Sequence, residues 1–179
     1  MGLDNLEPRP LSETDSSTAN TPPSSVTDTL NALDPLNDFA PSPPSSSVPW
    51  PNSTFIIRCL SSGHVLTLID GKVRLAPPGG RASIYWACVE TKGWLGFRNV
   101  SSGKYLGYGP RGNLICVADR HQNWENFCVR LRPDGGYVLL VTEWERLWHV
   151  GMKMVRGVEI LAKVGEGGSD GVVWEFVRV

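Results

Sequence analysis

The sequence lacks the long apolar runs and the leader of a membrane or secreted protein. No window approaches the roughly 18 consecutive apolar residues that a membrane-spanning helix requires. The first residues, Met1–Asp4, have neither the basic start nor the apolar stretch of a secretory signal. These absences predict a cytoplasmic or nuclear protein that has no membrane partner.

Cysteine and histidine are scarce, and neither is clustered. The four cysteines lie in separate apolar stretches, with no Cys-x-x-Cys pair, and the three histidines are far apart in the sequence. Four cysteines would suit two disulfides in an oxidising compartment, but in a cytoplasmic protein buried free thiols are favoured. The spacing indicates no metal-ligand cluster, so we expect neither a metal nor another cofactor.

Motifs that mark common enzymes are absent too. There is no Gly-x-Ser-x-Gly elbow, P-loop or dinucleotide fingerprint. Acidic residues such as Glu125 and Glu175 stand beside apolar strand residues, and we expect them to be solvated charges instead of catalytic carboxylates. The sequence therefore predicts that the protein is not an enzyme.

The charge is divided unequally along the chain. Residues 1–52 contain one basic and seven acidic residues, together with ten of the 14 prolines and much of the Ser and Thr. This composition cannot bury enough apolar surface to offset the entropy of ordering it, and predicts a disordered acidic tail over 1–52. Residues 53–179 carry a net charge of +5, but their basic residues are scattered, so no nucleic-acid partner is expected.

Two short patterns in the tail leave alternatives open. Leu30, Leu33, Leu36 and Phe39 recur at every third position, which fits either a docking motif or incidental linker residues. Thr21-Pro22 and Ser42-Pro43 are candidate proline-directed phosphorylation sites.

The amino-acid composition changes from Phe55 onward: aromatic and β-branched residues become frequent, and turn residues recur every eight to twelve positions. This is the pattern of an all-β domain, which we place at residues 53–179. Twelve strands are predicted, at residues 55–60, 65–69, 73–76, 84–90, 94–100, 105–108, 114–118, 124–131, 137–142, 147–151, 158–164 and 172–179.

An internal repeat organises these strands. The segment Arg58–Leu66 matches Arg98–Leu106 at an offset of forty residues, including a shared Ser-Ser-Gly turn. A second repeated segment begins with tryptophan in each unit, at Trp86, Trp124 and Trp174. The domain therefore consists of three units of four strands, at residues 55–90, 94–131 and 137–179.

Three four-stranded units in this length resemble the β-trefoil, in which six strands form a barrel and three hairpins cap it around a pseudo-threefold axis. The resemblance implies that one large side chain from each unit meets its counterparts on the axis. Trp86, Trp124 and Trp174 are the predicted structural core.

Two trefoil families share motifs with this chain. Gln122-Asn123-Trp124 resembles the Gln-x-Trp of ricin B-like lectins, but Thr67, Gly107 and His149 stand where those lectins carry their sugar-binding carboxylate. The turn at residues 102–107 is similar to that of the fascin-like trefoils, which bundle actin with several trefoils in series.

These resemblances imply a non-catalytic module that recognises a protein partner or a glycan through loops. A ricin B-like lectin and a fascin-like actin-associated module are the alternatives. The candidate binding residues, in and after the turn where Trp144 replaces Ser or Gly, are Trp144, Arg146, Trp148 and His149, with Trp94 and Tyr108 as further possibilities. A galactose site that uses Asp70 or Asp119 in place of the missing carboxylate is the sharpest rival.

Overall fold

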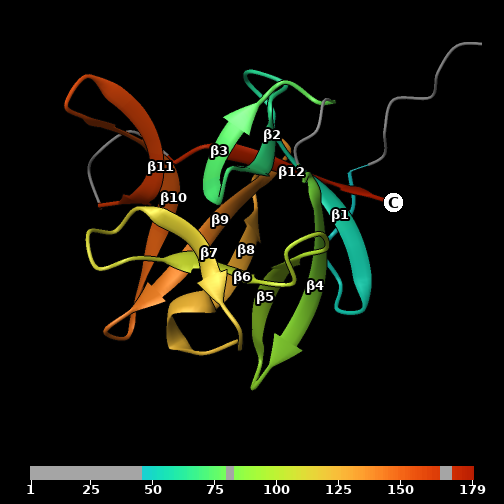
Figure 1. Cartoon of the computed structure of the whole chain (residues 1–179). Helices are drawn as coiled ribbons and strands as arrows, with labels where there is room; N and C mark the ends of the chain where they lie inside the picture. Colours follow the sequence, from blue (N-terminus) through green and yellow to red (C-terminus); the bar gives the residue numbers. More distant parts are fainter. Residues whose placement is uncertain (1–45, 80–82, 166–170) are drawn as a thin grey trace, which may run out of the picture. The chain divides into compact units, whose positions relative to one another are not determined.

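The computed structural model describes residues 46–79, 83–165 and 171–179, and over these residues it is an all-β protein (Figure 1). The predicted all-β class is thus confirmed. The docking-motif and phosphorylation-site hypotheses, and most of the predicted tail, lie outside the described residues. No helix in the described part of the chain is long and apolar enough to cross a membrane.

Twelve strands and a short 3-10 helix follow one another along the chain, and each strand overlaps a predicted range. Their bounds are β1 Ser53–Cys59, β2 Val65–Ile69, β3 Lys72–Ala76, β4 Tyr85–Thr91, β5 Trp94–Asn99, β6 Tyr105–Tyr108, β7 Leu114–Ala118, η1 Asn123–Glu125, β8 Phe127–Leu131, β9 Tyr137–Glu143, β10 Arg146–Val155, β11 Val158–Val164 and β12 Val173–Arg178.

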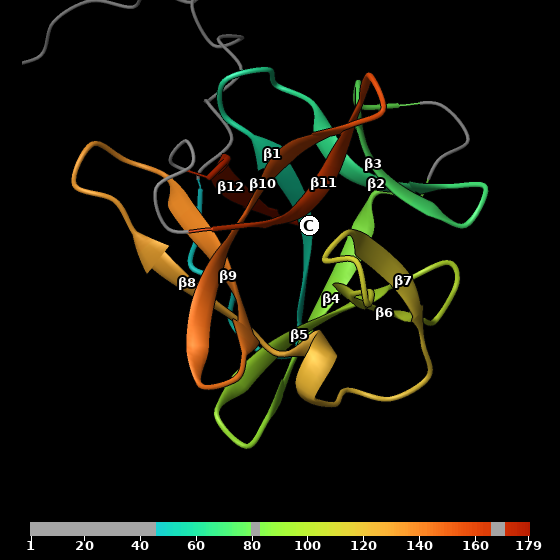
Figure 2. The same ribbon diagram turned by 90° about the vertical axis from the view of Figure 1, so that its left-hand side faces the viewer.

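Six of these strands pair antiparallel in a closed cycle. The cycle runs β1–β4–β5–β8–β9–β12 and returns to β1. The pairing is extensive between β4 and β5, with six residue pairs. Between β5 and β8 it consists of a single pair, Leu95 opposite Phe127. The other six strands form the hairpins β2–β3, β6–β7 and β10–β11. Figure 2 shows β8 and β9 on the left of the domain and the first two hairpins on the right.

The sequence repeat is also a repeat of strand register. Strand β2 joins β1 through Arg58 opposite Val65, and β6 joins β5 through Arg98 opposite Tyr105. Both residues of the second pair lie forty positions after those of the first. The repeated segment therefore builds the same junction between a cycle strand and a hairpin in the first and second units.

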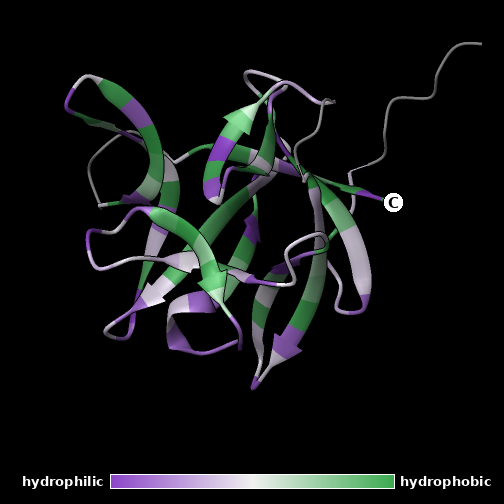
Figure 3. Ribbon diagram, viewed as in Figure 1, coloured by the Kyte–Doolittle hydropathy of each residue, from purple (hydrophilic) through white to green (hydrophobic). Residues whose placement is uncertain are grey.

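Aromatic side chains from all three units fill the core. Phe97 lies against Phe127 in an edge-on contact, with ring centroids 5.6 Å apart, and stacks on Phe176 at 5.8 Å. Trp86 and Trp174 are fully buried, as predicted. Figure 3 shows hydrophobic stretches along the strands and hydrophilic residues gathered in the turns and around η1. Burial of these rings is the main source of stability that the cycle offers.

Trp124 corrects the predicted core, because 48% of its surface is exposed. The tryptophan-led segment of the second unit, Trp124–Arg130, is two residues longer than its counterparts Trp86–Glu90 and Trp174–Arg178. Residues 123–125 form η1 instead of continuing the strand. Strand β8 consequently begins at Phe127, which is fully buried and takes the core position.

Two carboxylates expected to be solvated are in fact buried. Glu175 is 6% exposed and is satisfied by Arg58, whose Nε donates to Oε2 at 2.7 Å from the adjacent strand. Glu125 is 8% exposed, and its Oε2 accepts a hydrogen bond from the backbone N–H of Gln122 at 3.1 Å. Each acid is therefore part of the fold's internal hydrogen bonding.

The folded domain begins before the predicted boundary at residue 52. Ser46 pairs with Val177, and the Ser47 backbone N–H donates to the Phe176 carbonyl at 2.9 Å. Pro49 is buried in the same segment. The segment 46–52 is thus attached to β12 through Ser46 and Ser47 and to β4 through Asn52, whereas composition alone assigned it to the tail.

All four cysteines are free thiols, as predicted, and three of them are buried. Burial raises the pKa of Cys88 to about 12 and that of Cys116 to about 11. These two thiols stay protonated near neutral pH and act as small apolar core residues.

Candidate functional site

Two adjacent pockets lie around η1. The larger, which we call the aromatic pocket, has a volume of about 900 Å³; the smaller, which we call the amide pocket, has a volume of about 600 Å³. Both pockets are lined by Trp94, Asn123, Trp124 and Asn126. The two pockets therefore adjoin at these residues, and together we call them the groove. Tyr108 and Trp144 line only the aromatic pocket, and Lys92, His121 and Gln122 line only the amide pocket.

The aromatic pocket is built around a stacked pair. The rings of Tyr108 and Trp124 lie 5.7 Å apart, with planes 17° from parallel. The Tyr108 hydroxyl donates to the Thr142 carbonyl at 2.8 Å, which fixes the tyrosine between β6 and β9. Tyr108 is buried and Trp124 is half exposed, so the inner ring supports the outer one against the pocket.

Trp144 stands at the tip of the β9–β10 turn and is 90% exposed. Trp144 and Glu145 both have positive φ, 48° and 63°, so the backbone turns through two left-handed residues. Asn and Gly are the usual residues in such a hairpin turn, since a bulky side chain is strained there. A large exposed ring in this strained position has no evident role in folding, which favours a role in binding.

A charged pair supports the aromatic pocket from behind. Lys163 on β11 forms an ion pair with Glu143, and its Nζ lies 4.9 Å from the centre of the Tyr108 ring. The same Nζ lies 5.6 Å from the centre of the Trp148 ring. The cation–π contacts hold the two rings in place, and the ion pair neutralises the Glu143 carboxylate beside the pocket.

The four predicted binding residues are divided by the structure. Trp144 and Arg146 line the aromatic pocket. Trp148 and His149 are half-buried on β10 and do not line either pocket. His149 is packed against Gly171, where a Cβ would come within 2.9 Å of the His149 Cβ. Trp94 and Tyr108, the further possibilities, are both part of the pocket lining.

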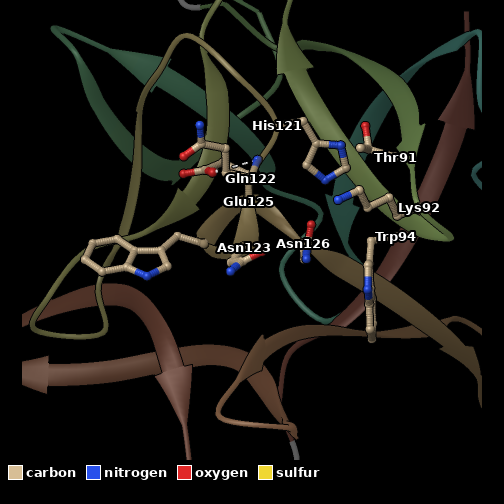
Figure 4. A pocket seen from close by; sticks show the side chains of 9 residues that line it. Thr91, Lys92, Trp94, His121, Gln122, Asn123, Glu125 and Asn126 are labelled. Carbon is tan, nitrogen blue, oxygen red and sulfur yellow. Dashed lines mark hydrogen bonds between the residues drawn. The ribbon is translucent and has the colours of Figure 1, made fainter.

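The amide pocket places polar groups on two sides (Figure 4). Lys92, Trp94 and His121 lie on one side, and Gln122 and Glu125 on the other. Burial lowers the pKa of His121, although a contact with the Asn126 side chain opposes this shift, and the imidazole is neutral near pH 7. Burial raises the pKa of the Glu125 carboxyl.

Glycine positions the His121 ring. The ring stacks on Tyr105 with centroids 5.9 Å apart, and a Cβ on Gly96 would come within 2.8 Å of it. The absence of a side chain at Gly96 is therefore what allows the imidazole to lie against β5.

The positions expected to match the lectin carboxylate cannot hold one. Thr67 is fully buried and donates to the Ser83 carbonyl at 3.3 Å. At Gly107 a Cβ would come within 2.8 Å of the Trp124 carbonyl oxygen, because η1 packs directly on this glycine. The proposed substitutes, Asp70 and Asp119, line neither pocket, and Asp119 is paired with Lys104 at 2.5 Å.

The amide side chains of Asn123 and Asn126 and the charged Lys92 also line the groove, although no sequence motif pointed to them as site residues. The mostly polar run Gln122-Asn-Trp-Glu-Asn126, which overlaps the start of the strand predicted at 124–131, was the available signal, since it breaks the alternation of a half-buried strand. A polar run of this kind indicates a loop, and here the loop carries the centre of the groove.

No protein-family model and no curated protein matches this chain by sequence. Among solved structures, a ricin B-like lectin from Macrolepiota procera in complex with lactose is similar over 74% of this chain and 100% of its own, with a TM-score of 0.57 and 16% identity. The endo-β-galactosidase of Clostridium perfringens that releases GlcNAcα1-4Gal has a TM-score of 0.58 and 16% identity, over 71% of this chain. An exo-β-1,3-galactanase from Clostridium thermocellum has a TM-score of 0.57 and 19% identity, also over 71% of this chain.

These neighbours correct the prediction that the chain is not an enzyme, because two of the three are glycoside hydrolases. The chain spans 32% of the length of the endo-β-galactosidase and 30% of the exo-galactanase, whereas it spans the whole lectin. At such low identities the likeness shows the fold alone. The fold is thus shared by a lectin and by parts of enzymes that act on galactose-containing glycans.

Proposed function

We propose that residues 46–179 form a β-trefoil module that binds a glycan in the aromatic pocket. The observation that carries this proposal is the set of rings that line the pocket, Trp94, Tyr108, Trp124 and Trp144, beside the amides of Asn123 and Asn126. The closed cycle of six strands, its three hairpins and the forty-residue repeat support the trefoil arrangement.

The lining suits the two kinds of surface that a sugar offers. A pyranose ring has an apolar C–H face, which packs on an exposed aromatic ring and is thereby removed from water. Its hydroxyl groups both donate and accept hydrogen bonds, as do the side-chain amides of Asn123 and Asn126. A pocket of rings with a few polar groups at its edge therefore recognises both surfaces at once.

Galactose-containing glycans are the proposed ligand class. The lectin neighbour holds lactose, and the two enzyme neighbours act on galactose-containing chains. Because Thr67 and Gly107 replace the lectin carboxylate, we place the site in the aromatic pocket, between η1 and the β9–β10 turn.

Calorimetric titration of the full chain with lactose and with β-1,3-galacto-oligosaccharides tests the proposal. Trp144→Ala and Trp124→Ala should each weaken binding by about tenfold or more, which corresponds to about 1.4 kcal/mol. Trp50→Ala is the matched control, because Trp50 is 65% exposed and lies outside both pockets. Absence of binding, or equal affinity in all three variants, contradicts the proposal.

The second candidate ligand is a protein partner. Trp144 favours it, because its side chain is 90% exposed and tryptophan is typical of interface hot spots. The same variants decide between the two. Loss of glycan affinity in Trp144→Ala supports the glycan site. Loss of a co-purifying protein from Trp144→Ala, with no glycan bound by the unaltered chain, supports the protein partner.

A further inference from the structure

The groove has room and polar chemistry beyond the aromatic pocket. The amide pocket adds about 600 Å³ and shares its lining with the aromatic pocket at Trp94, Asn123, Trp124 and Asn126. A ligand that stacks on Trp124 can therefore continue past η1 without leaving the protein surface. The continuation is lined by Thr91, Lys92, His121 and Gln122, which are all polar.

Lys92 is the unpaired charge in this second pocket. It forms no ion pair among the described residues, whereas Lys104, Arg132 and Lys163 are each held by a carboxylate. Lys92 has a positive φ of 53° and Gly93 one of 84°, so the tight β4–β5 turn fixes where the lysine leaves the backbone. Figure 4 shows its side chain on the same side of the pocket as His121.

The carboxylates of the groove do not compensate Lys92. Glu125 is buried, and burial raises the pKa of its carboxyl. Glu143 is paired with Lys163. Glu145 is exposed in the β9–β10 turn and lines only the aromatic pocket. The amide pocket thus presents a free ammonium group to a ligand, together with hydrogen-bonding groups.

We propose that the groove holds at least two sugar residues, with a neutral sugar in the aromatic pocket and an acidic sugar residue, bearing a carboxylate or a sulfate, beside Lys92. This inference rests on the proposed function and deepens it. A subsite that carries a lysine beside an aromatic one distinguishes an acidic oligosaccharide from its neutral core.

Titration of the full chain with lactose, 3′-sialyllactose and 3′-sulfated lactose tests the inference. At low salt, at least one of the acidic sugars should bind about fivefold tighter than lactose, the gain that one solvent-accessible ion pair gives. The advantage should shrink in 0.5 M NaCl, since salt screens exposed charges. The two acidic ligands show whether a carboxylate or a sulfate is preferred.

Lys92→Gln should abolish the affinity advantage of the acidic sugars over lactose. Lys72→Gln is the matched control, because Lys72 is an exposed lysine on β3 outside both pockets. Equal affinity for lactose and both acidic sugars overturns the inference but leaves the proposed function standing. An affinity advantage of the acidic sugars that persists in Lys92→Gln has the same consequence. If no sugar binds at all, both proposals fail.

Discussion

Replacing Trp86 and Trp124 separately by alanine should have very different effects on stability, although the two residues occupy the same place in the sequence repeat. Trp86 is fully buried, and its Nε1 donates to the Leu66 carbonyl at 2.9 Å. Emptying a large aromatic side chain from a core costs about 3–5 kcal/mol. The carbonyl left without a partner adds about 1 kcal/mol.

Trp124 has much less to lose. Nearly half of its surface, 48%, is already exposed, and its main contact is the stack on Tyr108. An aromatic pair contributes about 0.5–1.5 kcal/mol beyond area burial, so Trp124→Ala should lower the free energy of unfolding by about 1–2 kcal/mol. Trp174→Ala, from the other fully buried tryptophan, should behave like Trp86→Ala.

Urea denaturation of the three variants measures these losses, provided that the m-value stays constant. A difference of at least 2 kcal/mol between Trp86→Ala and Trp124→Ala is expected. Losses that agree within about 0.5 kcal/mol would refute the reasoning. They would place Trp124 in the core and remove the ring on which the aromatic pocket depends.

Three further outcomes are expected. Burial holds the pKa of Glu125 above its ordinary value of 4.5, so stability should fall as pH rises from 4.5 through the folded pKa. Glu125→Gln should remove that fall and be the more stable protein at pH 7 in thermal melts; a steeper fall contradicts the pKa assignment. Gly107→Ala should displace Trp124, costing about 1–3 kcal/mol and weakening lactose binding, while unchanged affinity means that η1 tolerates the methyl group. Deletion of 1–45 should leave the melting temperature nearly unchanged, whereas extending it through 46–52 should lower it by several degrees; equal melting temperatures would show that 46–52 adds no stability.

The amino-acid sequence by itself determined the class of the domain, its strands and its internal repeat. Alternating apolar residues and closely spaced turn residues are local signals, and each predicted strand was found. The repeated segment even carried its register, since Arg58 with Val65 and Arg98 with Tyr105 form equivalent junctions. Two of the three predicted core tryptophans, Trp86 and Trp174, followed from the same repeat.

Only the tertiary structure decided that Trp124 lies partly exposed at the surface and not in the core. The tryptophan-led segment of the second unit has two additional residues and contains η1, and Gly107 leaves the space into which η1 packs. Whether extra residues are absorbed as a bulge within a strand or as a turn before it depends on the packing around them, which a pattern of residue types does not contain.

The groove likewise exists only in three dimensions. Trp94, Tyr108, Trp124 and Trp144 come from β5, β6, η1 and the β9–β10 turn, so they span fifty residues of the sequence. The sequence placed Trp144 in an exposed turn because the turn is local. It did not reveal that the other rings lie beside Trp144, because antiparallel pairing and the packing of η1 bring distant segments together through contacts that no local pattern records.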